Sequence, residues 1–181
     1  MRIFAPTDGI WTIRLHGDIV LDGSYHAWIA LPQFIDGTVE SLTPNPNFTV
    51  VCPATSIGPI ISGAYNPRDG SLFMSSSWGP SRTGIQNPDL VAPGVNVGGA
   101  TPSGYGNMSG TSVAAAITAG AAAIILQWAI VHQNEPRVNT LKMRTILIRG
   151  CERSQDMTYP NPRWGYGKLN LLNSFNVIKR L

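Results

Sequence analysis

The chain has 181 residues, of which 43% are hydrophobic and 13% charged, so it can form one domain with a substantial core. No run of eighteen apolar residues occurs and the N-terminus lacks the apolar region of a secretory signal, so we expect neither a membrane span nor a leader. Residues 1–131 carry four Lys or Arg against seven Asp or Glu, a net charge of −3, whereas residues 132–181 carry nine against three, a net charge of +6. The basic residues are dispersed without interleaved aromatic residues, so we expect a solvated surface and no nucleic-acid partner.

The first segment, residues 9–43, has the alternation of apolar and polar residues that is typical of strands. Residues 11–15 and 25–31 each alternate, and Asp22-Gly23 between them is a turn signal, so a β-hairpin is predicted. The sequence Pro44-Asn45-Pro46-Asn47 then interrupts regular structure. We place a domain boundary there, with residues 1–43 as a β-rich segment and residues 44–181 as the main domain.

Residues 48–99 read as short strands joined by turns. Residues 48–51, 90–91 and 95–97 are predicted as short strands, and residues 57–65 form a mostly apolar run with β-branched residues that suits a buried strand. The residues from Asn66 to Gly70 form a turn.

Three helices are predicted after residue 110. The first runs from about Thr111 to His132 and is rich in alanine and glycine, which indicates a buried helix closely surrounded by other backbone elements. The second begins after an N-cap at Asn139 and ends near Arg149. The third spans residues 170–179 and is amphipathic.

Ser112 is the leading candidate for a functional residue. It follows Gly110-Thr111 at the start of the alanine-rich helix, where backbone N–H groups have no helical partner and the helix dipole is positive. One residue could there supply both a hydroxyl nucleophile and an oxyanion donor. The alternative is structural, because serine is also a preferred N-cap residue.

Four segments of the chain occur in an order that resembles the subtilisin-like serine peptidases. They are Met74-Ser75-Ser76-Ser77-Trp78-Gly79-Pro80, Asn87-Pro88-Asp89-Leu90-Val91-Ala92-Pro93-Gly94, Gly110-Thr111-Ser112 through Gly120, and Gly165-Tyr166-Gly167-Lys168-Leu169-Asn170. The resemblance covers roughly residues 46–176 and is strongest between residues 74 and 123. One departure is that Ala115-Ala116-Ile117 stand where the family usually has Ser-Pro-His.

The resemblance implies an α/β fold, the C-terminal portion of a three-layer structure with a parallel sheet and helices on both faces. It also implies hydrolysis of peptide bonds in a peptide or protein substrate by an Asp-His-Ser triad. Ser112 would be the nucleophile and would donate its own N–H to the oxyanion, while Gly110 and Thr111 would shape the substrate cleft. Trp78, Tyr105 and Asn107 are candidates for cleft residues, with loop anchoring as the alternative.

The segment 1–43 resembles the end of the β-rich, jelly-roll insert of clostridial germination proteases. This subgroup implies a secreted, envelope-associated or spore-associated protein. Cys52 and Cys151 lack the spacing of metal ligands, so no metal or cofactor is predicted from the residues. The resemblance alone admits a calcium ion around residues 64–69.

The Asp and His motifs of the family, and the asparagine of its oxyanion hole, precede the region that this chain resembles. Asp18 and His26 occur in the right order relative to Ser112, but a surface hairpin is a poor place for a catalytic base. We therefore expect the chain alone to be inactive, because serine needs an adjacent base to become a nucleophile.

Two other functions remain open: a non-catalytic, peptidase-like binding or regulatory module, and a scaffold in which Ser112 is only a cap. Half of such a sheet would also leave apolar surface uncovered. We expect it to pair with the missing N-terminal half or with a second copy of the chain.

Overall fold

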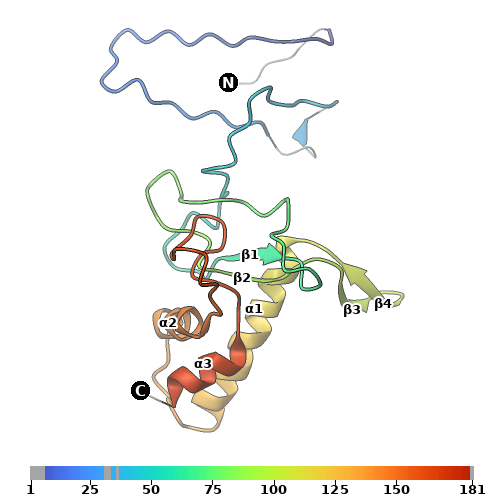
Figure 1. Cartoon of the computed structure of the whole chain (residues 1–181), viewed down its shortest axis with the longest axis vertical. Helices are drawn as coiled ribbons and strands as arrows, with labels where there is room; N and C mark the ends of the chain where they lie inside the picture. The colour runs from blue at the N-terminus through green and yellow to red at the C-terminus, as the bar shows by residue number, and fades with distance from the viewer. Residues whose placement is uncertain (1–6, 31–33, 36, 180–181) are drawn as a thin grey trace. The chain divides into compact units, whose positions relative to one another are not determined.

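The computed structural model describes residues 7–30, 34–35 and 37–179 of the chain. These belong to two compact units, Met1–Pro44 and Asn45–Leu181. The regular elements of the described residues all lie in the second unit (Figure 1). They are β1 (Ser62–Tyr65), β2 (Leu90–Pro93), β3 (Val97–Thr101), β4 (Gly104–Met108), α1 (Thr111–Leu126), the π-helix η2 (Gln127–Val131), α2 (Thr140–Gly150) and α3 (Leu171–Ile178).

The hairpin predicted in residues 9–43 is absent from the part of this unit that the structure describes, which contains no strand. Part of the second predicted strand, residues 31–33, lies outside the described residues. The apolar side chains of the alternating segment are solvent-exposed, including Trp11 at 54% and Ile13 at 61%. An isolated pair of strands is marginal in water because it has nothing on which to bury its apolar face, and this unit supplies no such surface.

The second unit is built on two short parallel strands, β1 and β2. Ser62 pairs with Leu90 and Tyr65 with Pro93. Beyond β2, Val91 forms a parallel bridge with Lys168, which brings the segment after Gly165-Tyr166-Gly167 alongside the sheet. Parallel strands joined by long connections and covered by helices define an α/β fold, as predicted.

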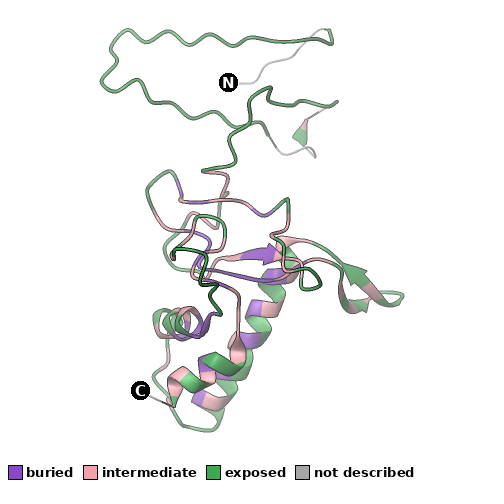
Figure 2. Cartoon of the chain, viewed as in Figure 1, coloured by how far each residue is buried: buried purple, intermediate pink, exposed green. Residues whose placement is uncertain are grey.

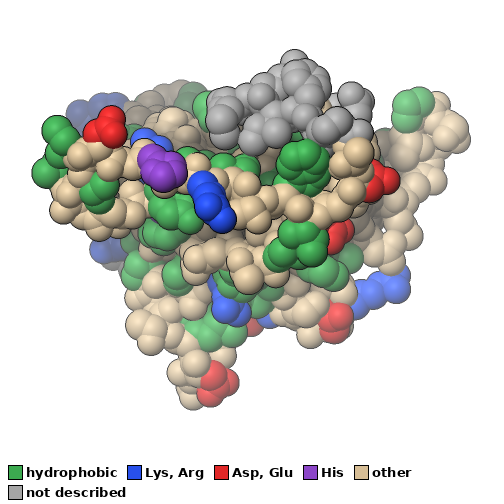
Figure 3. All heavy atoms as spheres, turned by 90° about the horizontal axis from the view of Figure 1, so that it is seen from above, with side chains coloured by type: hydrophobic (Ala, Val, Ile, Leu, Met, Phe, Trp, Pro, Cys, Tyr) green, Lys and Arg blue, Asp and Glu red, His purple; other side chains and the backbone are tan. Residues whose placement is uncertain are grey.

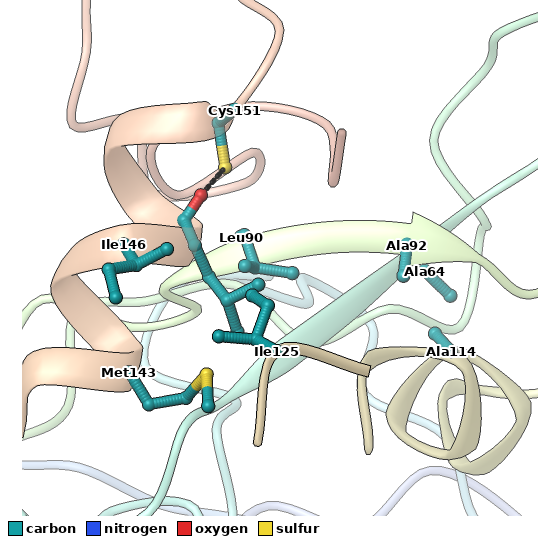
Figure 4. Close-up of a cluster of buried hydrophobic side chains, with 9 residues drawn as sticks. Ala64, Leu90, Ala92, Ala114, Ile125, Met143, Ile146 and Cys151 are labelled. Atoms are coloured by element: carbon teal, nitrogen blue, oxygen red, sulfur yellow. Dashed lines mark hydrogen bonds between the residues drawn. The ribbon is translucent and has the colours of Figure 1, made fainter. Parts of the chain in front are cut away.

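The core lies on one face of this sheet, where the side chains of Ala64, Leu90 and Ala92 meet those of the helices (Figure 4). α1 contributes Ala114 and Ile125, and α2 contributes Met143, Ile146 and Leu147. α3 packs against the same cluster through Leu171, Phe175 and Ile178. The described helices therefore share one face of the sheet, and the second helical layer that the resemblance implies is not represented among them.

Helix α1 is buried along one side only (Figure 2). Its buried residues are Ala114, Thr118, Ala121 and Ile125, spaced as one helical stripe. The expectation that this helix is enclosed on all sides is wrong, because Ala115, Ala116, Ala119, Gly120 and Ala123 are exposed. By length and composition the segment Thr111–Val131 could cross a membrane, a test that core helices of soluble proteins also pass.

The ends of the other helices agree with their sequence signals. The Asn139 side chain accepts a hydrogen bond from the backbone N–H of Lys142, which caps α2 as predicted. Asn170 caps α3 in the same way through the N–H of Asn173.

The prediction of strands was less accurate. Residues 48–51 form no strand, and the apolar run 57–65 is a strand only from Ser62 to Tyr65. The antiparallel hairpin of β3 and β4 was missed in part, since only the start of β3 was predicted. Glycines at four positions of the hairpin hide the apolar alternation that identifies a strand.

An ion pair between the fully buried Asp89 and the partly buried Arg144 ties the start of β2 to α2. Asp89 precedes β2 and has no exposed surface. One of its carboxylate oxygens accepts from the backbone N–H of Ile61 at 2.8 Å, and the other accepts from two nitrogens of the Arg144 guanidinium. Both oxygens of the carboxylate therefore accept hydrogen bonds, one from the residue before β1 and the other from α2. This gives the Pro-Asp-Leu-Val segment a structural role.

Candidate active site

The turn that carries Ser112 lies at the carboxyl ends of the two parallel strands. Gly94, directly after β2, donates its N–H to the Tyr65 carbonyl at the end of β1, at 2.9 Å. The Gly94 carbonyl in turn accepts the N–H of Gly110 at 2.7 Å. Ligands of open α/β sheets bind outside the carboxyl ends of the strands, so this is where a functional residue is expected.

Gly94 permits this close approach because it has no side chain. A Cβ at Gly94 would lie 2.6 Å from the Cβ of Ala64, 2.8 Å from the carbonyl oxygen of Gly110 and 3.3 Å from the Cβ of Ala114. Any larger residue would therefore push the Gly110 turn away from the sheet. The sequence places Gly94 in a family-like motif, but this contact across 16 positions has no local signal.

A second hydrogen bond fixes the other side of the turn. The backbone N–H of Asn96 donates to the hydroxyl of Ser109 at 2.8 Å, which closes the base of the β3–β4 hairpin just before Gly110. Asn96 adopts a left-handed backbone conformation, with φ of 53°, that asparagine tolerates better than most residues. Ser109 and Asn96 were not identified from the sequence as parts of the site.

Ser112 is the second residue of α1 and is exposed. The N-cap is Gly110, whose φ is 154°, and it makes no side-chain cap hydrogen bond. The interpretation of Ser112 as an N-cap is therefore wrong. Among the described residues neither the hydroxyl nor the N–H of Ser112 has a hydrogen-bond partner, and both lie at the positive end of the helix dipole.

The second unit places no histidine near Ser112. His132 is the one histidine in residues 45–179, and it follows the last turn of η2. At 1.5 Å per residue it lies about 30 Å from Ser112 along the helix axis. His16 and His26 belong to the unit Met1–Pro44, which is described separately.

Cys151 is unsuited to act as an alternative nucleophile. It is buried at the end of α2, and its thiol donates to the Leu147 carbonyl at 3.3 Å. Burial raises the pKa of this thiol to about 12, so it stays protonated at neutral pH. Cys52 is exposed.

The three candidate cleft residues have different surroundings. Trp78 borders a hollow of about 270 Å³ together with Pro46, Thr49 and residues 74–77, and the Arg163 guanidinium lies 3.8 Å from its ring centroid. This stacking holds the loop in place. Tyr105 is 93% exposed in the β3–β4 hairpin, and Asn107 pairs with Gly98 in the same hairpin.

The segment 64–69 offers one carboxylate, that of Asp69. This carboxylate already accepts hydrogen bonds from Ser71 and Asn66, and the Ser71 bonds lower its pKa. Calcium usually takes six to eight oxygen ligands, so these side chains alone do not fit the ion. The described residues also contain no group of three or more His, Cys, Asp or Glu that could hold a metal.

An exposed serine at the start of a helix, at the carboxyl ends of parallel strands, is an arrangement found in α/β hydrolytic enzymes. The family model for the subtilase family matches residues 39–167. The chain therefore belongs to the subtilase family of serine peptidases, as its four sequence segments predicted.

The relatives are longer than this chain. Serine protease AprX of Bacillus subtilis is 33% identical over an alignment of 147 residues, and the match covers 70% of this chain and 31% of AprX. The structure of the CspB protease of Clostridium perfringens matches with a TM-score of 0.73 and 34% identity, over 77% of this chain and 31% of that one. The patellamide maturation protease PatA matches with a TM-score of 0.58 and 28% identity, over 71% of this chain and 46% of that chain. The chain thus spans less than half the length of each of these relatives.

Proposed function

We propose that this chain carries the nucleophile of a serine endopeptidase and that Ser112 attacks the carbonyl carbon of a peptide bond. The observation that supports this most directly is the position of Ser112. Ser112 is an exposed residue on a turn that two glycine main-chain hydrogen bonds fix to the sheet, and neither its hydroxyl nor its backbone N–H has a partner among the described residues.

The backbone N–H of Ser112 would donate to the oxyanion that forms as the hydroxyl attacks. This donor is preorganised, because the first turn of α1 already orients it, and the helix dipole favours negative charge at this end. Gly110 and Thr111 would line the cleft beside the scissile bond. The substrate class is a peptide or a protein.

The hydroxyl proton must pass to a base, and residues 45–179 do not place a histidine within reach. We propose that residues 1–181 alone hydrolyse peptides very slowly or not at all. Full activity would then need the Asp and His motifs that the resemblance places upstream.

A fluorophosphonate probe tests this proposal because it reacts only with activated serines. The chain would be labelled alone and after co-expression with the part of the CspB protease that the structural match leaves uncovered. We expect labelling only in the second case, and its loss in Ser112→Ala. Ser103→Ala, at the exposed tip of the β3–β4 hairpin, is the matched control and should label normally.

Absence of Ser112-dependent labelling in a stable complex of the two parts would contradict the peptidase. It would instead favour the non-catalytic binding module.

A further inference from the structure

A hollow of about 340 Å³ lies in the second unit, apart from the turn that carries Ser112. Three segments that are distant in the sequence line it: the glycine of the turn after β1, the loop of residues 152–159 that follows α2, and the glycine-rich segment 164–168. Charged and aromatic side chains from these segments meet there, and the candidate active site uses none of them.

The sheet holds the charged residues of this hollow in place. Lys168 extends the sheet past β2 through its bridge to Val91, and Glu152 pairs with Lys168, each backbone N–H donating to the other's carbonyl at 2.9 Å. Ala64 points into the core, and neighbouring residues of a strand point to opposite faces, so Tyr65 projects from the face away from the helices. The hollow therefore has a rigid base that is separate from the core.

The ammonium group of Lys168 has no acceptor. Its Nζ lies 5.1 Å from the centroid of the Tyr65 ring and 5.7 Å from that of Trp164. A Cβ at Gly70 would lie 3.4 Å from this Nζ, so glycine leaves room for the ammonium there. Lys168 is half-buried and forms no ion pair or side-chain hydrogen bond among the described residues. A lysine ammonium has three N–H donors, and an anion bound in the hollow would satisfy them.

Arg153 supplies a second cation beside the first. Its Nε donates to the Tyr166 carbonyl at 3.0 Å and one terminal nitrogen donates to the Ile148 carbonyl at 3.1 Å, which fixes the guanidinium. Its other terminal nitrogen has no partner within the described part of the chain. The hollow thus offers donors from two fixed or half-buried cations to one anionic group.

The Glu152 carboxylate is an acceptor at the same hollow. It forms no ion pair with any described residue, although two cations line the hollow with it. Burial and, to a smaller extent, the negative charge of Glu152 raise the pKa of Tyr65, so this carboxylate lies on the Tyr65 side of the hollow. An N–H donor of a ligand could therefore be matched there while an anionic group lies beside Lys168.

Aromatic and thioether side chains complete the wall. The rings of Trp164 and Tyr65 lie 6.4 Å apart, which supports the indole from behind. In the loop, the Tyr159 hydroxyl accepts the N–H of Ser154 at 3.2 Å and donates to the Met157 sulfur at 3.7 Å. These contacts hold an apolar surface against which a ligand side chain can pack.

We propose that this hollow binds the C-terminal residue of a peptide that ends in a free carboxylate and has an apolar last side chain. Such a residue carries the three groups that the hollow matches: a carboxylate for Lys168 and Arg153, a main-chain N–H for Glu152, and a side chain to pack against Trp164. An inorganic anion would use the cations alone. The binding does not involve Ser112, so the proposal goes beyond the proposed function and does not need it.

An NMR titration of the isotope-labelled full chain tests this proposal. The indole N–H signal of Trp164 is assigned by its loss in Trp164→Phe. The probes are N-acetyl-Ala-Ala-Leu with a free carboxylate and the same peptide with an amidated end. The acid should shift the Trp164 signal to saturation and bind at least about tenfold more tightly than the amide, because the amide lacks the charge that Lys168 and Arg153 recognise. This ratio is measured on the wild-type chain and needs no variant.

Substitutions then locate the carboxylate. Lys168→Gln should weaken binding of the acid at least about tenfold, with folding checked by circular dichroism. Lys179→Gln, a matched change at an exposed lysine at the end of α3, should bind as tightly as the wild type. Ser112→Ala should also bind the acid normally. A wild-type chain that binds the acid but never reacts with the fluorophosphonate would refute only the peptidase.

Four outcomes would overturn the proposal. They are equal binding of acid and amide, unchanged affinity of a folded Lys168→Gln variant for the acid, displacement of the acid by an equal concentration of inorganic phosphate, and equally tight binding of an amidated peptide with an internal glutamate. The last result would show that the hollow recognises acidic side chains and not a chain end. Absence of acid binding would leave the catalytic role of Ser112 untouched.

Discussion

The two units of this chain differ in how far their apolar residues are buried. In Met1–Pro44, Ile19 and Leu21 are 88% and 98% exposed, and Figure 3 shows hydrophobic side chains at the surface of the molecule. In Asn45–Leu181, Leu90, Val91 and Leu147 have no exposed surface. In β1 and β2 an apolar segment is stable as a strand because a second strand pairs with it and a helix covers it. The second unit provides both and the first does not.

The largest expected effect comes from the same substitution made in each unit. Leu147→Ala should destabilise the protein by about 3–4 kcal/mol, because it removes a fully buried side chain and leaves a cavity. Leu21→Ala should change the free energy of unfolding by less than about 0.5 kcal/mol. Urea denaturation of both variants gives the comparison, and similar losses would show that the first unit has a core of its own.

The next effect concerns arginine. Arg144→Met should cost about 2–3 kcal/mol, because it leaves the buried carboxylate of Asp89 without its cation. Arg14→Met, in the exposed first unit, should be neutral within about 0.5 kcal/mol. Thermal unfolding followed by circular dichroism measures both. An unchanged Tm for Arg144→Met would mean that the ion pair contributes nothing.

A smaller effect is expected at two glycines. Gly94→Ala should cost about 2 kcal/mol, because its Cβ would collide with the backbone of Gly110 and the Cβ of Ala64. At Gly17 an added Cβ would meet only a methyl group of the exposed Val20 side chain, which can move into solvent, so Gly17→Ala should cost less than about 0.5 kcal/mol. Hydrogen exchange around residues 108–114 would show whether the first change also loosens the turn before Ser112.

The smallest effect concerns side chains that accept a hydrogen bond from a backbone N–H. Asn139→Ala removes the cap of α2 and should cost about 1 kcal/mol. The Asp22 carboxylate accepts from Ser24 N–H in an exposed turn, and Asp22→Ala should have almost no effect on unfolding. If both variants lose equal stability in calorimetry, the turn at Asp22 is part of a cooperative structure.

Much of the second unit could be predicted from its sequence because the signals are local. The Asn139 cap before α2, the joint extent of α1 and η2, and the short strand at Leu90 were all predicted from residues within those segments. The β3–β4 hairpin could not be predicted as easily, because its glycines and polar residues lack an apolar alternation. The prediction of strands in the first unit was wrong for the opposite reason. Its apolar alternation was clear, but the unit offers no surface on which those side chains could be buried.

For the candidate site, motif order drew attention to Ser112 and Gly110, whose catalytic roles stay predictions. The contacts that hold them were beyond sequence reasoning. The approach of Gly94 to Gly110 and the bond from Asn96 to Ser109 join positions 13–16 residues apart, and each depends on how β2 and the hairpin meet in space.

The two main-chain hydrogen bonds that link Tyr65, Gly94 and Gly110 determine which substitutions this region can tolerate in evolution. Each of these hydrogen bonds joins a main-chain carbonyl to a main-chain N–H, which every residue except proline carries, so this side of the turn does not depend on the chemistry of nearby side chains. Side chains around the turn can be exchanged, and the surface beside Ser112 remodelled for a new target, while the hydroxyl keeps its place relative to the sheet. Three positions restrict this freedom: Gly94, where a methyl group would collide with the Gly110 carbonyl; Gly110, whose φ of 154° favours glycine; and Ser109, whose hydroxyl accepts from Asn96.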